Sequence, residues 1–329
     1  MPKRPRLTPA IADLRRAVRE SLKQAKSQKG QVVLAAVSGG ADSLAMAAAL
    51  VFEAPKLNLD FAAVIVDHNL QNDSAKVAKT TKKILLNLGY KKVKIVKVKV
   101  GKAGGPEAAA RTARYKAINT TVSSLGASFV MLGHTLDDQA EQVLLGLARG
   151  SGAKSLSGMQ KQNGIYLRPF LEIDRASTEK FCEDSLLEPW FDPHNYDEKF
   201  LRVRVRQNVF PILEKELGPG IKDALVRSAN QLREDDEFLE SHTNELFQRK
   251  AKVSKNKIEL EVSELNELSA SIRNRLIKKS LDLLTKESSR QSVLAVAELV
   301  LNWHGQKALT LSGVRVERKG EIITLKATQ

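Results

Sequence analysis

Short apolar runs alternate with amphipathic stretches through the first two thirds of the chain. VVLAAV (32–37), FAAVIVDHN (61–69) and SFVMLGH (128–134) are nearly continuous apolar runs, which are typical of strands buried on both faces. KKVKIVKVKV (91–100) alternates Lys with apolar residues, as a half-exposed or edge strand does. Each run is followed by a helical pattern, namely SLAMAAALVFE (43–53), SAKVAKTTKKILLNLG (74–89), GPEAAARTARYKAINTTVSSLG (105–126) and TLDDQAEQVLLGLARG (135–150). The alternation predicts an α/β fold with a doubly wound parallel sheet, which binds ligands at the carboxyl ends of its strands.

The pattern changes at Gly218-Pro219-Gly220, which we interpret as the start of a second region. Residues 1–217 then form the first domain, and residues 218–329 form a linker helix with a smaller, mixed α+β domain. Its predicted elements are a long charged helix (221–252), a strand KIELEV (257–262), two helices over 264–304 and a hairpin around Lys319-Gly320.

Charge is unevenly distributed along the chain. The net charge is +15, and residues 1–215 carry 34 Lys+Arg against 21 Asp+Glu, whereas residues 216–329 carry 19 against 17. The basic first part is suited to a polyanion, although a merely solvated basic surface would have the same composition.

Cysteine content and the amino terminus limit the class of protein. The single cysteine, Cys182, excludes an intramolecular disulfide and any CxxC metal or redox site. MPKRPRLTPA (1–10) is basic but lacks the apolar core of a signal peptide. The apolar stretch 32–52 is interrupted by Asp42 and by a Ser-Gly-Gly turn, so we do not expect it to span a membrane. We expect a soluble, cytoplasmic protein without a membrane partner; the sequence indicates no oligomeric state.

The segment SGGADS, residues 38–43, lies between the first predicted strand and its helix. Gly39 and Gly40 could simply permit a tight turn, but Ser38, Asp42 and Ser43 add hydroxyls and a carboxylate around a helix N-terminus. Neither GxxxxGK[ST] nor GxGxxG is present, so the pattern predicts a loop that holds a phosphate without a lysine.

Two rows of charged residues have helical spacing. His134, Asp138 and Glu141 follow at i, i+4 and i+7, which predicts that they share one face, with Asp137 as a helix cap. This row suits recognition of a cation together with phosphate chemistry, whereas acidic residues in a first turn can also be simple dipole partners. Glu107, Arg111 and Arg114 form a similar row, and a surface ion pair explains it equally well.

A basic segment follows a short aromatic stretch. Arg202, Arg204 and Arg206 alternate with valines, an arrangement that suits phosphates on a strand or a helix, as well as a solvated basic face. Trp190, Phe191 and Tyr196 could stack on an unpaired base, but a place in the core is the simpler interpretation.

Taken in order, these motifs resemble those of the PP-loop (N-type) ATP pyrophosphatases, and within them the tRNA(Ile)-lysidine synthase family. The resemblance covers about residues 30–210. It rests on SGGADS, VDHNL, PEAAARTARY, GHTLDDQAEQVLLGLARGSGAKSLSGM, RPFLEI and WFDPHN, and more loosely on the C-terminal part. The sequence departs from the family's pattern at Gln71, Gln142, His194 and Val203, which puts the local contacts of these residues in doubt.

The resemblance implies a two-step reaction. ATP adenylates C2 of the wobble cytidine of a tRNA(Ile) with a CAU anticodon and releases pyrophosphate; free lysine then displaces AMP and gives lysidine. Residues 38–43 (Ser38, Gly39, Gly40, Ala41, Asp42, Ser43) would bind ATP, with Asp42 as a ligand of Mg²⁺. His134 would lie near the α-phosphate, and Asp42, His134 and Asp138 would be catalytic. Arg114, Asp138 and Glu141 would bind lysine, and Arg202, Arg204 and Arg206 are the residues we expect to bind tRNA.

Three other functions remain as alternatives. Thiolation of tRNA by a related enzyme generally needs paired cysteines, and an amidotransferase relative needs a glutaminase domain with a nucleophilic cysteine. A non-catalytic nucleotide-sensing or RNA-binding module would explain the basic residues but not the acidic rows that we expect to face the loop.

Overall fold

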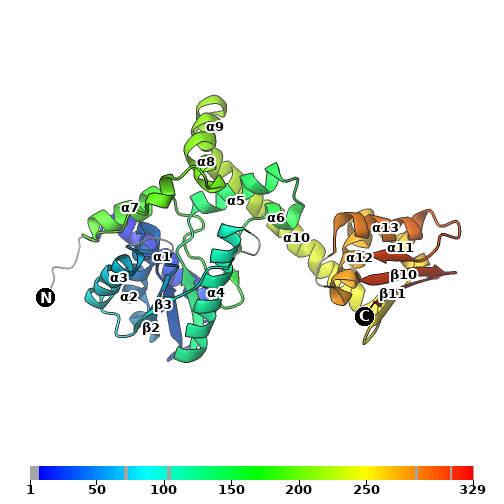
Figure 1. Cartoon of the computed structure of the whole chain (residues 1–329), viewed down its shortest axis with the longest axis horizontal. Coiled ribbons are helices and arrows are strands. Elements are labelled where there is room, and N and C mark those ends of the chain that lie inside the picture. The colour runs from blue at the N-terminus through cyan, green and yellow to red at the C-terminus, as the bar shows by residue number, and fades with distance from the viewer. Residues whose placement is uncertain (1–6, 70–72, 102–104, 286–287, 312, 329) are drawn as a thin grey trace. The chain divides into compact units, whose positions relative to one another are not determined.

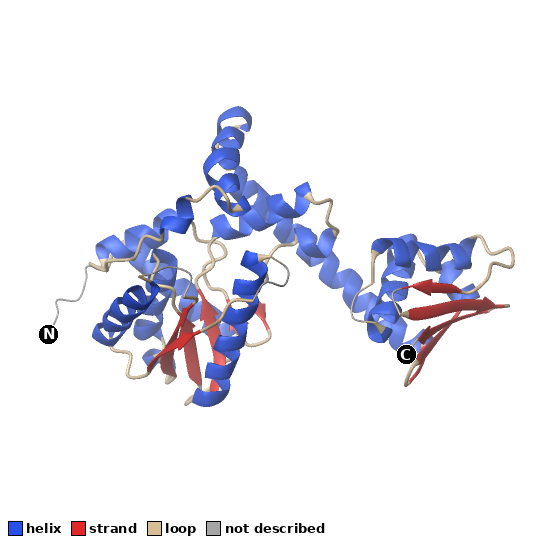
Figure 2. Ribbon diagram, in the orientation of Figure 1, coloured by secondary structure: helices blue, strands red, loops and turns tan. Residues whose placement is uncertain are grey.

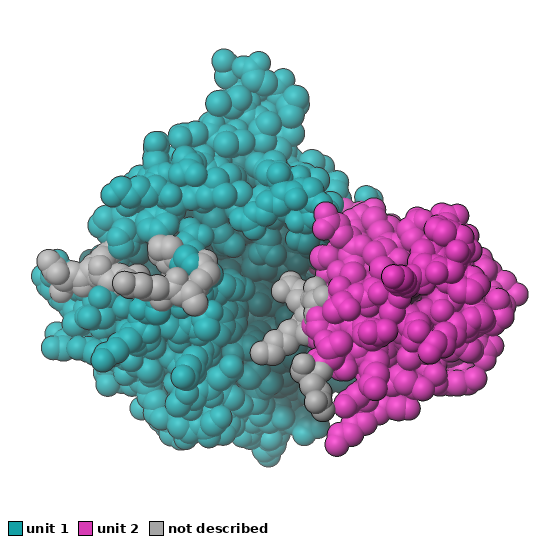
Figure 3. Space-filling model, turned by 45° about the vertical axis from the view of Figure 1, so that its right-hand side comes forward, with its two compact units in different colours: residues 1–231 teal, residues 232–329 magenta. Residues whose placement is uncertain are grey.

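The chain folds as two compact units, residues 1–231 and 232–329, which Figure 3 shows in different colours. A computed structural model describes residues 7–69, 73–101, 105–285, 288–311 and 313–328. The division between the units falls within helix α10 (Ile221–Lys250). No helix in the described ranges has both the length and the apolar character needed to cross a membrane.

A six-stranded sheet forms the centre of the first unit (Figures 1 and 2). Its strands stand in the order β3-β2-β1-β4-β6-β5, and every pair is parallel except β5 with β6. The strands are β1 (Val32–Ala36), β2 (Asp60–Asp67), β3 (Val93–Lys97), β4 (Ala127–Leu132), β5 (Gln162–Asn163) and β6 (Tyr166–Leu167). The strand order reverses at β1, because β2 lies on one side of it and β4 on the other. The segment SGGADS leaves the sheet at this switch point, where such sheets bind ligands.

Helices cover both faces of the sheet. Val33 and Ala35 of β1 belong to the core beneath α1, α2, α3 and α7, whereas Leu34 belongs to the core beneath α4, which contains Ile118. This alternation within one strand confirms the predicted doubly wound α/β fold. The helices are α1 (Pro9–Gln24), α2 (Ala41–Glu53), α3 (Ser74–Leu88), α4 (Pro106–Leu125) and α7 (Arg175–Asp184). Short 3-10 turns follow α2 and α7, at η1 (Pro55–Leu57) and η2 (Pro193–Tyr196).

A third group of helices completes the first unit. These are α5 (Leu136–Ala148), α6 (Ala153–Leu156), α8 (Leu201–Arg204), η3 (Val205–Val209), α9 (Phe210–Leu217) and the first part of α10. Of these, α5, η3, α9 and α10 share a small core of Leu136, Ala140, Leu145, Val205, Phe210 and Val226. The basic segment is therefore helical, and η3 has π-helical geometry. Because a helix distributes its residues around its axis, Arg202, Arg204 and Arg206 do not point the same way.

The second unit is an antiparallel sheet, ordered β7-β8-β11-β10-β9, covered by helices. The elements are β7 (Lys252–Ser254), β8 (Lys257–Glu261), α11 (Val262–Glu267), α12 (Ala270–Leu284), α13 (Arg290–Leu301), β9 (Leu309–Leu311), β10 (Val314–Lys319) and β11 (Ile322–Ala327). The predicted hairpin at Lys319-Gly320 is confirmed by the pairing of β10 with β11. The prediction of two helices over 264–304 is wrong, because extended backbone at Leu268 and Ser269 separates α11 from α12.

Candidate functional site

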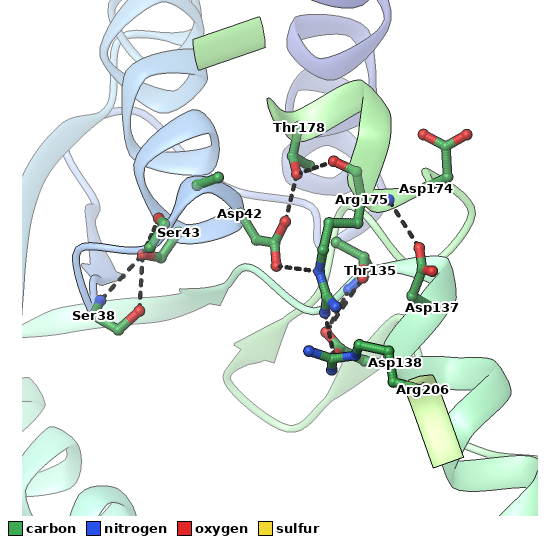
Figure 4. Close-up of polar contacts among 12 residues, drawn as sticks. Ser38, Asp42, Ser43, Thr135, Asp137, Asp138, Asp174, Arg175, Thr178 and Arg206 are labelled. Carbon is green, nitrogen blue, oxygen red and sulfur yellow. Dashed lines mark hydrogen bonds and ion pairs between the residues drawn. The ribbon is translucent and has the colours of Figure 1, made fainter. Parts of the chain in front are cut away.

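The segment SGGADS forms a tight turn from β1 into α2. The Ser38 N–H donates to Ser43 Oγ at 3.1 Å, and Ser43 Oγ donates to the Gly40 carbonyl at 3.0 Å. Gly40 is the N-cap of α2 and offers no capping side chain, so the first amides of the helix are not satisfied by a cap residue. Figure 4 shows the two serines side by side at this turn. The turn thus presents amides and hydroxyls, which suit a phosphate.

Two glycines allow the turn to pack closely. Gly39 has a φ of +99°, and a Cβ there would lie 2.6 Å from Thr81 Oγ1. A Cβ at Gly133, between β4 and α5, would lie 2.9 Å from the backbone of Asp42. Side chains at either position would therefore force α3 or the β4–α5 connection away from the first turn of α2.

Asp42 points from the start of α2 toward α7 (Figure 4). Thr178 Oγ1 donates to Asp42 Oδ1, and Arg175 Nε donates to Oδ2 at 3.4 Å. Burial raises the pKa of Asp42, and the charge of Arg175 and the hydrogen bond from Thr178 oppose that rise. Sequence reasoning missed Arg175 and Thr178, because they lie 133 and 136 residues from Asp42.

The amino-terminal end of α5 is capped differently from the prediction. Thr135 is the N-cap, and Asp138 completes a capping box by accepting the Thr135 N–H at 3.0 Å. Asp137, which we expected to cap the helix, instead accepts hydrogen bonds from the Arg175 N–H at 2.9 Å and from Lys222 Nζ at 2.6 Å. Burial would raise the pKa of Asp137, but the hydrogen bonds from Lys222 and from the Arg175 N–H, together with the charges of both residues, outweigh it and the pKa is lowered. Asp137 therefore ties α5 to α7 and α10.

His134 lies before the N-cap of α5, so it does not belong to a helical row with Asp138 and Glu141 as predicted. Its side chain is half-buried, and its Nδ1 is buried without a hydrogen-bond partner. Burial, together with the charges of Arg114 and Arg168, lowers the pKa of His134 to about 3, although Asp138 opposes the shift. The imidazole is therefore neutral at physiological pH, and it is a weaker base than an ordinary histidine.

Asp138 and Glu141 are linked to Asp42 through two arginines. Arg175 Nη2 donates to Asp138 Oδ1 at 3.1 Å, and Arg206 Nη2 lies 3.8 Å from the same oxygen. Arg206 Nε donates to Glu141 Oε1 at 2.7 Å. We call these five residues the carboxylate–arginine chain. Burial raises the pKa of Glu141, and Arg206 opposes this. Arg206, which we expected on a tRNA-binding surface, thus turns toward the acidic residues.

Four other arginines, Arg111, Arg114, Arg168 and Arg202, have no carboxylate within ion-pair distance in the part of the chain that the structure describes. We call them the arginine group. Burial lowers the pKa of Arg114, and the nearby charges of Arg111 and Arg202 lower it further, against Tyr115. Arg168 is buried, and its Nη1 donates to the Gln160 carbonyl at 3.0 Å. Unpaired guanidiniums beside His134 make this region suited to an anion.

A cavity opens beside the turn, at the ends of β1 and β2. Its lining consists of Ser38, Ile65, Val66, Asp67, His68, Asn69, Ser74, Val77, Ala78, Trp190, Asp192 and His194. Asp67 is buried, and its Oδ2 has no hydrogen-bond partner. Apolar walls with one unpaired carboxylate oxygen suit a nucleoside, whose base is planar and whose edges donate hydrogen bonds.

The aromatic residues of WFDPHN occupy different environments. Trp190 lines the cavity, and its backbone N–H donates to the Gly39 carbonyl at 2.9 Å. Phe191 and Tyr196 are 70% and 68% exposed, so our expectation that they lie in the core is wrong. Among the departures from the family pattern, Val203 is buried, His194 lines the cavity, and Gln71 lies outside the described residues.

Most of the predicted site residues thus lie in one connected region. Residues 38–43, His134, Asp138 and Glu141 are joined by hydrogen bonds or by mutual electrostatic effects, and Arg114 affects the pKa of His134. Asp67, Arg168, Arg175 and Thr178 were not predicted. The position of Asp67 after a strand was the one available signal, since ligands collect at strand ends.

Comparison with known proteins identifies the family. A model of the PP-loop domain family matches residues 13–213. A tRNA(Ile)-lysidine synthase of Leifsonia xyli subsp. xyli is 49% identical over 297 residues, which are 90% of each chain. Another from Thermobifida fusca is 44% identical over 320 residues, which are 96% of this chain and 97% of the relative.

A solved structure supports the fold independently. The U34-tRNA thiolase NcsA from Methanococcus maripaludis, determined with its [4Fe-4S] cluster, matches with a TM-score of 0.57 and 24% identity. The match covers 68% of this chain and 80% of the thiolase, and at this identity it indicates the fold alone. The family model, the extent of the identities and the SGGADS turn agree: the chain belongs to the PP-loop family and, within it, to the tRNA(Ile)-lysidine synthases.

Proposed function

We propose that this chain ligates free lysine to C2 of the wobble cytidine of a tRNA(Ile) with a CAU anticodon, at the expense of ATP. In the first step the cytidine O2 attacks the α-phosphorus, the bond to the β-phosphate breaks and pyrophosphate leaves. In the second step the lysine Nε attacks C2, the C2–O2 bond breaks and AMP leaves with that oxygen. The observation that carries the proposal is the pair of carboxylates, half-buried Asp138 and buried Glu141. They are connected to Asp42 of the phosphate-binding turn through Arg175 and Arg206.

The turn and its surroundings have separate tasks in the first step. The amides of Gly39 and Gly40 and the hydroxyls of Ser38 and Ser43 would hold the pyrophosphate group as it leaves. The nucleoside of ATP would occupy the cavity beside Trp190. Such a loop holds the phosphates without a lysine, which leaves the α-phosphorus open to attack.

The residues present fit a magnesium ion. Asp42 supplies a carboxylate beside the phosphate-binding turn, and Mg²⁺ on a nucleotide is usually held by one or two carboxylates and by phosphate oxygens. When bound, the ion would neutralise charge on the phosphates. Its binding requires that Asp42 loosen its hydrogen bonds with Arg175 and Thr178.

Lysine would lie between two regions of opposite charge. Its ammonium needs carboxylates, which Asp138 and Glu141 supply, and its carboxylate needs a cation, which Arg114 of the arginine group supplies. Charges of both regions act on His134, and its neutral imidazole can form a hydrogen bond with the α-phosphate group.

Thiolation is a poor alternative on the observed environment of Cys182. Its side chain is buried, and burial raises the pKa of the thiol to about 12. A nucleophilic cysteine has a lowered pKa and is exposed to its substrate.

The test is to incubate the protein with ATP, labelled lysine and a tRNA(Ile) transcript with a CAU anticodon. We expect label in the tRNA and one AMP per lysine incorporated. A matched transcript with uridine at the wobble position should take up no lysine. Absence of lysine from the first transcript, or equal incorporation into both, would overturn the proposal. A cytoplasmic location is part of the same proposal, since tRNA is its substrate.

A further inference from the structure

Arg206 is hydrogen-bonded to Glu141, one of the two carboxylates that we propose to bind the ammonium of lysine. Glu141 is 1% exposed, and its Oε1 accepts a hydrogen bond from Arg206 Nε at 2.7 Å. The other oxygen, Oε2, is buried without a partner. Arg206 Nη2 also lies 3.8 Å from Asp138 Oδ1. Asp138 and Glu141, which we call the ammonium subsite, therefore already face a guanidinium.

An ammonium and this guanidinium compete for the same negative charge. Lysine would bring a second cation beside Arg206, and like charges at such distances repel strongly where water is excluded. Arg175 already neutralises Asp138 from the other side. In the observed arrangement the subsite is therefore a poor one for lysine, although the orphaned Glu141 Oε2 provides an acceptor once Arg206 leaves.

The segment that carries Arg206 is built to respond to a polyanion. Arg206 lies in η3, a π-helical turn between α8 and α9. Such turns are rare in proteins, and those that occur are often found at functional sites. Arg202 and Arg204 precede it on the same segment, and neither has a carboxylate partner among the described residues. Arg206 is itself part-exposed, with 27% of its side chain accessible. An RNA phosphate at this segment would offer Arg206 a competing anion.

We propose that Arg206 plugs the ammonium subsite in the free protein, and that tRNA withdraws it and so opens the site for lysine. This inference rests on the proposed function. It assigns to Arg206 a positioning role that couples the two substrates: lysine gains affinity only after the tRNA is bound. Free lysine would then not occupy the site unproductively.

The coupling can be measured on the whole protein without a chemical reaction. Binding of labelled lysine is measured by equilibrium dialysis in the absence of ATP, with and without tRNA(Ile). We expect tRNA to tighten lysine binding by roughly 5- to 150-fold, the usual range of allosteric coupling. Lysine should tighten tRNA binding by the same factor, because linkage is reciprocal. A factor of one in the wild type would overturn the proposal.

Substitution of Arg206 identifies the plug. Arg206→Gln should bind lysine more tightly than the wild type without tRNA, and adding tRNA should give no further gain. Arg227→Gln, which removes an exposed guanidinium of α10, is the control and should retain the wild-type coupling factor. Weaker lysine binding by Arg206→Gln would show instead that Arg206 is a lysine ligand, and unchanged coupling would also refute the plug.

Two further measurements keep the outcomes separable. If Arg206→Gln does not fold, Arg206→Lys replaces it, and its shorter reach should reduce the coupling factor; an unchanged factor would refute the plug. Lysidine formation by the wild type is measured in parallel. Wild-type activity without coupling refutes the plug alone, whereas coupling without lysidine formation refutes the proposed function alone.

Discussion

In the carboxylate–arginine chain each carboxylate accepts a hydrogen bond from an arginine, whereas the guanidiniums of the arginine group have no carboxylate partner among the described residues. Charges of both regions act on His134, whose pKa responds to Asp138 and to Arg114. The carboxylate–arginine chain sets two arginines against three carboxylates, whereas the arginine group keeps its positive charge.

The difference indicates how each region is prepared for its ligand. A cation removed from water without an anion is costly, and Arg168 is buried while Arg114 and Arg202 are half-buried. The arginine group therefore gains from any carboxylate or phosphate that enters. The carboxylate–arginine chain has already satisfied most of its charge and gains from lysine only if a protein arginine moves away. The arginine group therefore favours tight binding of anions. The carboxylate–arginine chain makes the binding of lysine depend on the position of an arginine.

The largest effect is expected at the end of the carboxylate–arginine chain next to the phosphate-binding turn. Asp42→Asn should lower the rate of pyrophosphate release by about 100- to 1000-fold, the loss typical of removing one group that stabilises transition-state charge. The melting temperature should hardly change, because burial already disfavours the ionised form of Asp42. Asp60→Asn, at the exposed start of β2, is the control. Near wild-type turnover of Asp42→Asn would remove Asp42 from the mechanism.

Glu141→Gln tests whether the carboxylates recognise the lysine ammonium. A hydrogen bond to a charged group contributes about 1.5 to 3 kcal/mol, so the KM for lysine should rise by about 10- to 100-fold. The KM for ATP should stay near the wild-type value, since ATP brings no cation to this region. Steady-state kinetics with each substrate varied in turn measures both constants. An equal rise in the two KM values would contradict the assignment.

His134, between the two regions, predicts a dependence of stability on pH. The pKa of His134 is about 3 in the folded protein and near its ordinary value of 6.5 when unfolded. Between these values the unfolded chain binds the extra proton, so the free energy of unfolding falls as pH falls. Between about pH 7.5 and about pH 5, His134 alone should lower the free energy of unfolding by about 2 kcal/mol.

The measurement is urea unfolding of the wild type and of His134→Gln at both pH values. The difference between the two proteins isolates His134, because His68, whose pKa burial also lowers, is present in both. The variant should lose less stability on acidification. If both proteins lose the same free energy, His134 is not held neutral by the fold.

Sequence patterns predicted the long central strands of the sheet but not the short strands at or next to the edges of the two sheets. The central strands β1, β2 and β4 are buried on both faces, and such strands have apolar runs too long to miss. Strands β5, β6, β7 and β9 span only two or three residues, so no periodicity can indicate them. Helix α1 was also missed, although Ile11, Leu14, Val18 and Leu22 of its buried face repeat at helical spacing.

Within the site, spacing predicted neighbours along one helix but not partners from another. The proximity of Asp138 and Glu141 on α5 follows from their spacing. The pairing of Glu141 with Arg206 joins positions 65 residues apart and depends on how α5 and η3 pack. Asp137 and Asp138 are equally plausible caps by composition; the choice depends on Lys222 and Arg175, which draw Asp137 away from the backbone.

The smallest expected effect concerns the salt dependence of tRNA binding. Unit 1 carries 36 Lys+Arg against 23 Asp+Glu, and unit 2 carries 17 against 15. If phosphates bind mainly to arginines that lack acidic partners, Arg202→Gln should reduce the slope of log K against log salt by roughly 0.7 to 0.9, one phosphate contact. Arg315→Gln, at an exposed arginine of β10, should leave the slope nearly unchanged.

The measurement is tRNA affinity at several salt concentrations for both variants and for a chain ending at Gln231. This shortened chain retains Lys222 and Val226 and hence the packing of α10 on unit 1. This shortened chain should keep most of the slope while losing preference for the correct tRNA. If it loses most of the slope, the lysines of unit 2 dominate the electrostatic attraction, and the arginine group serves the small substrates alone.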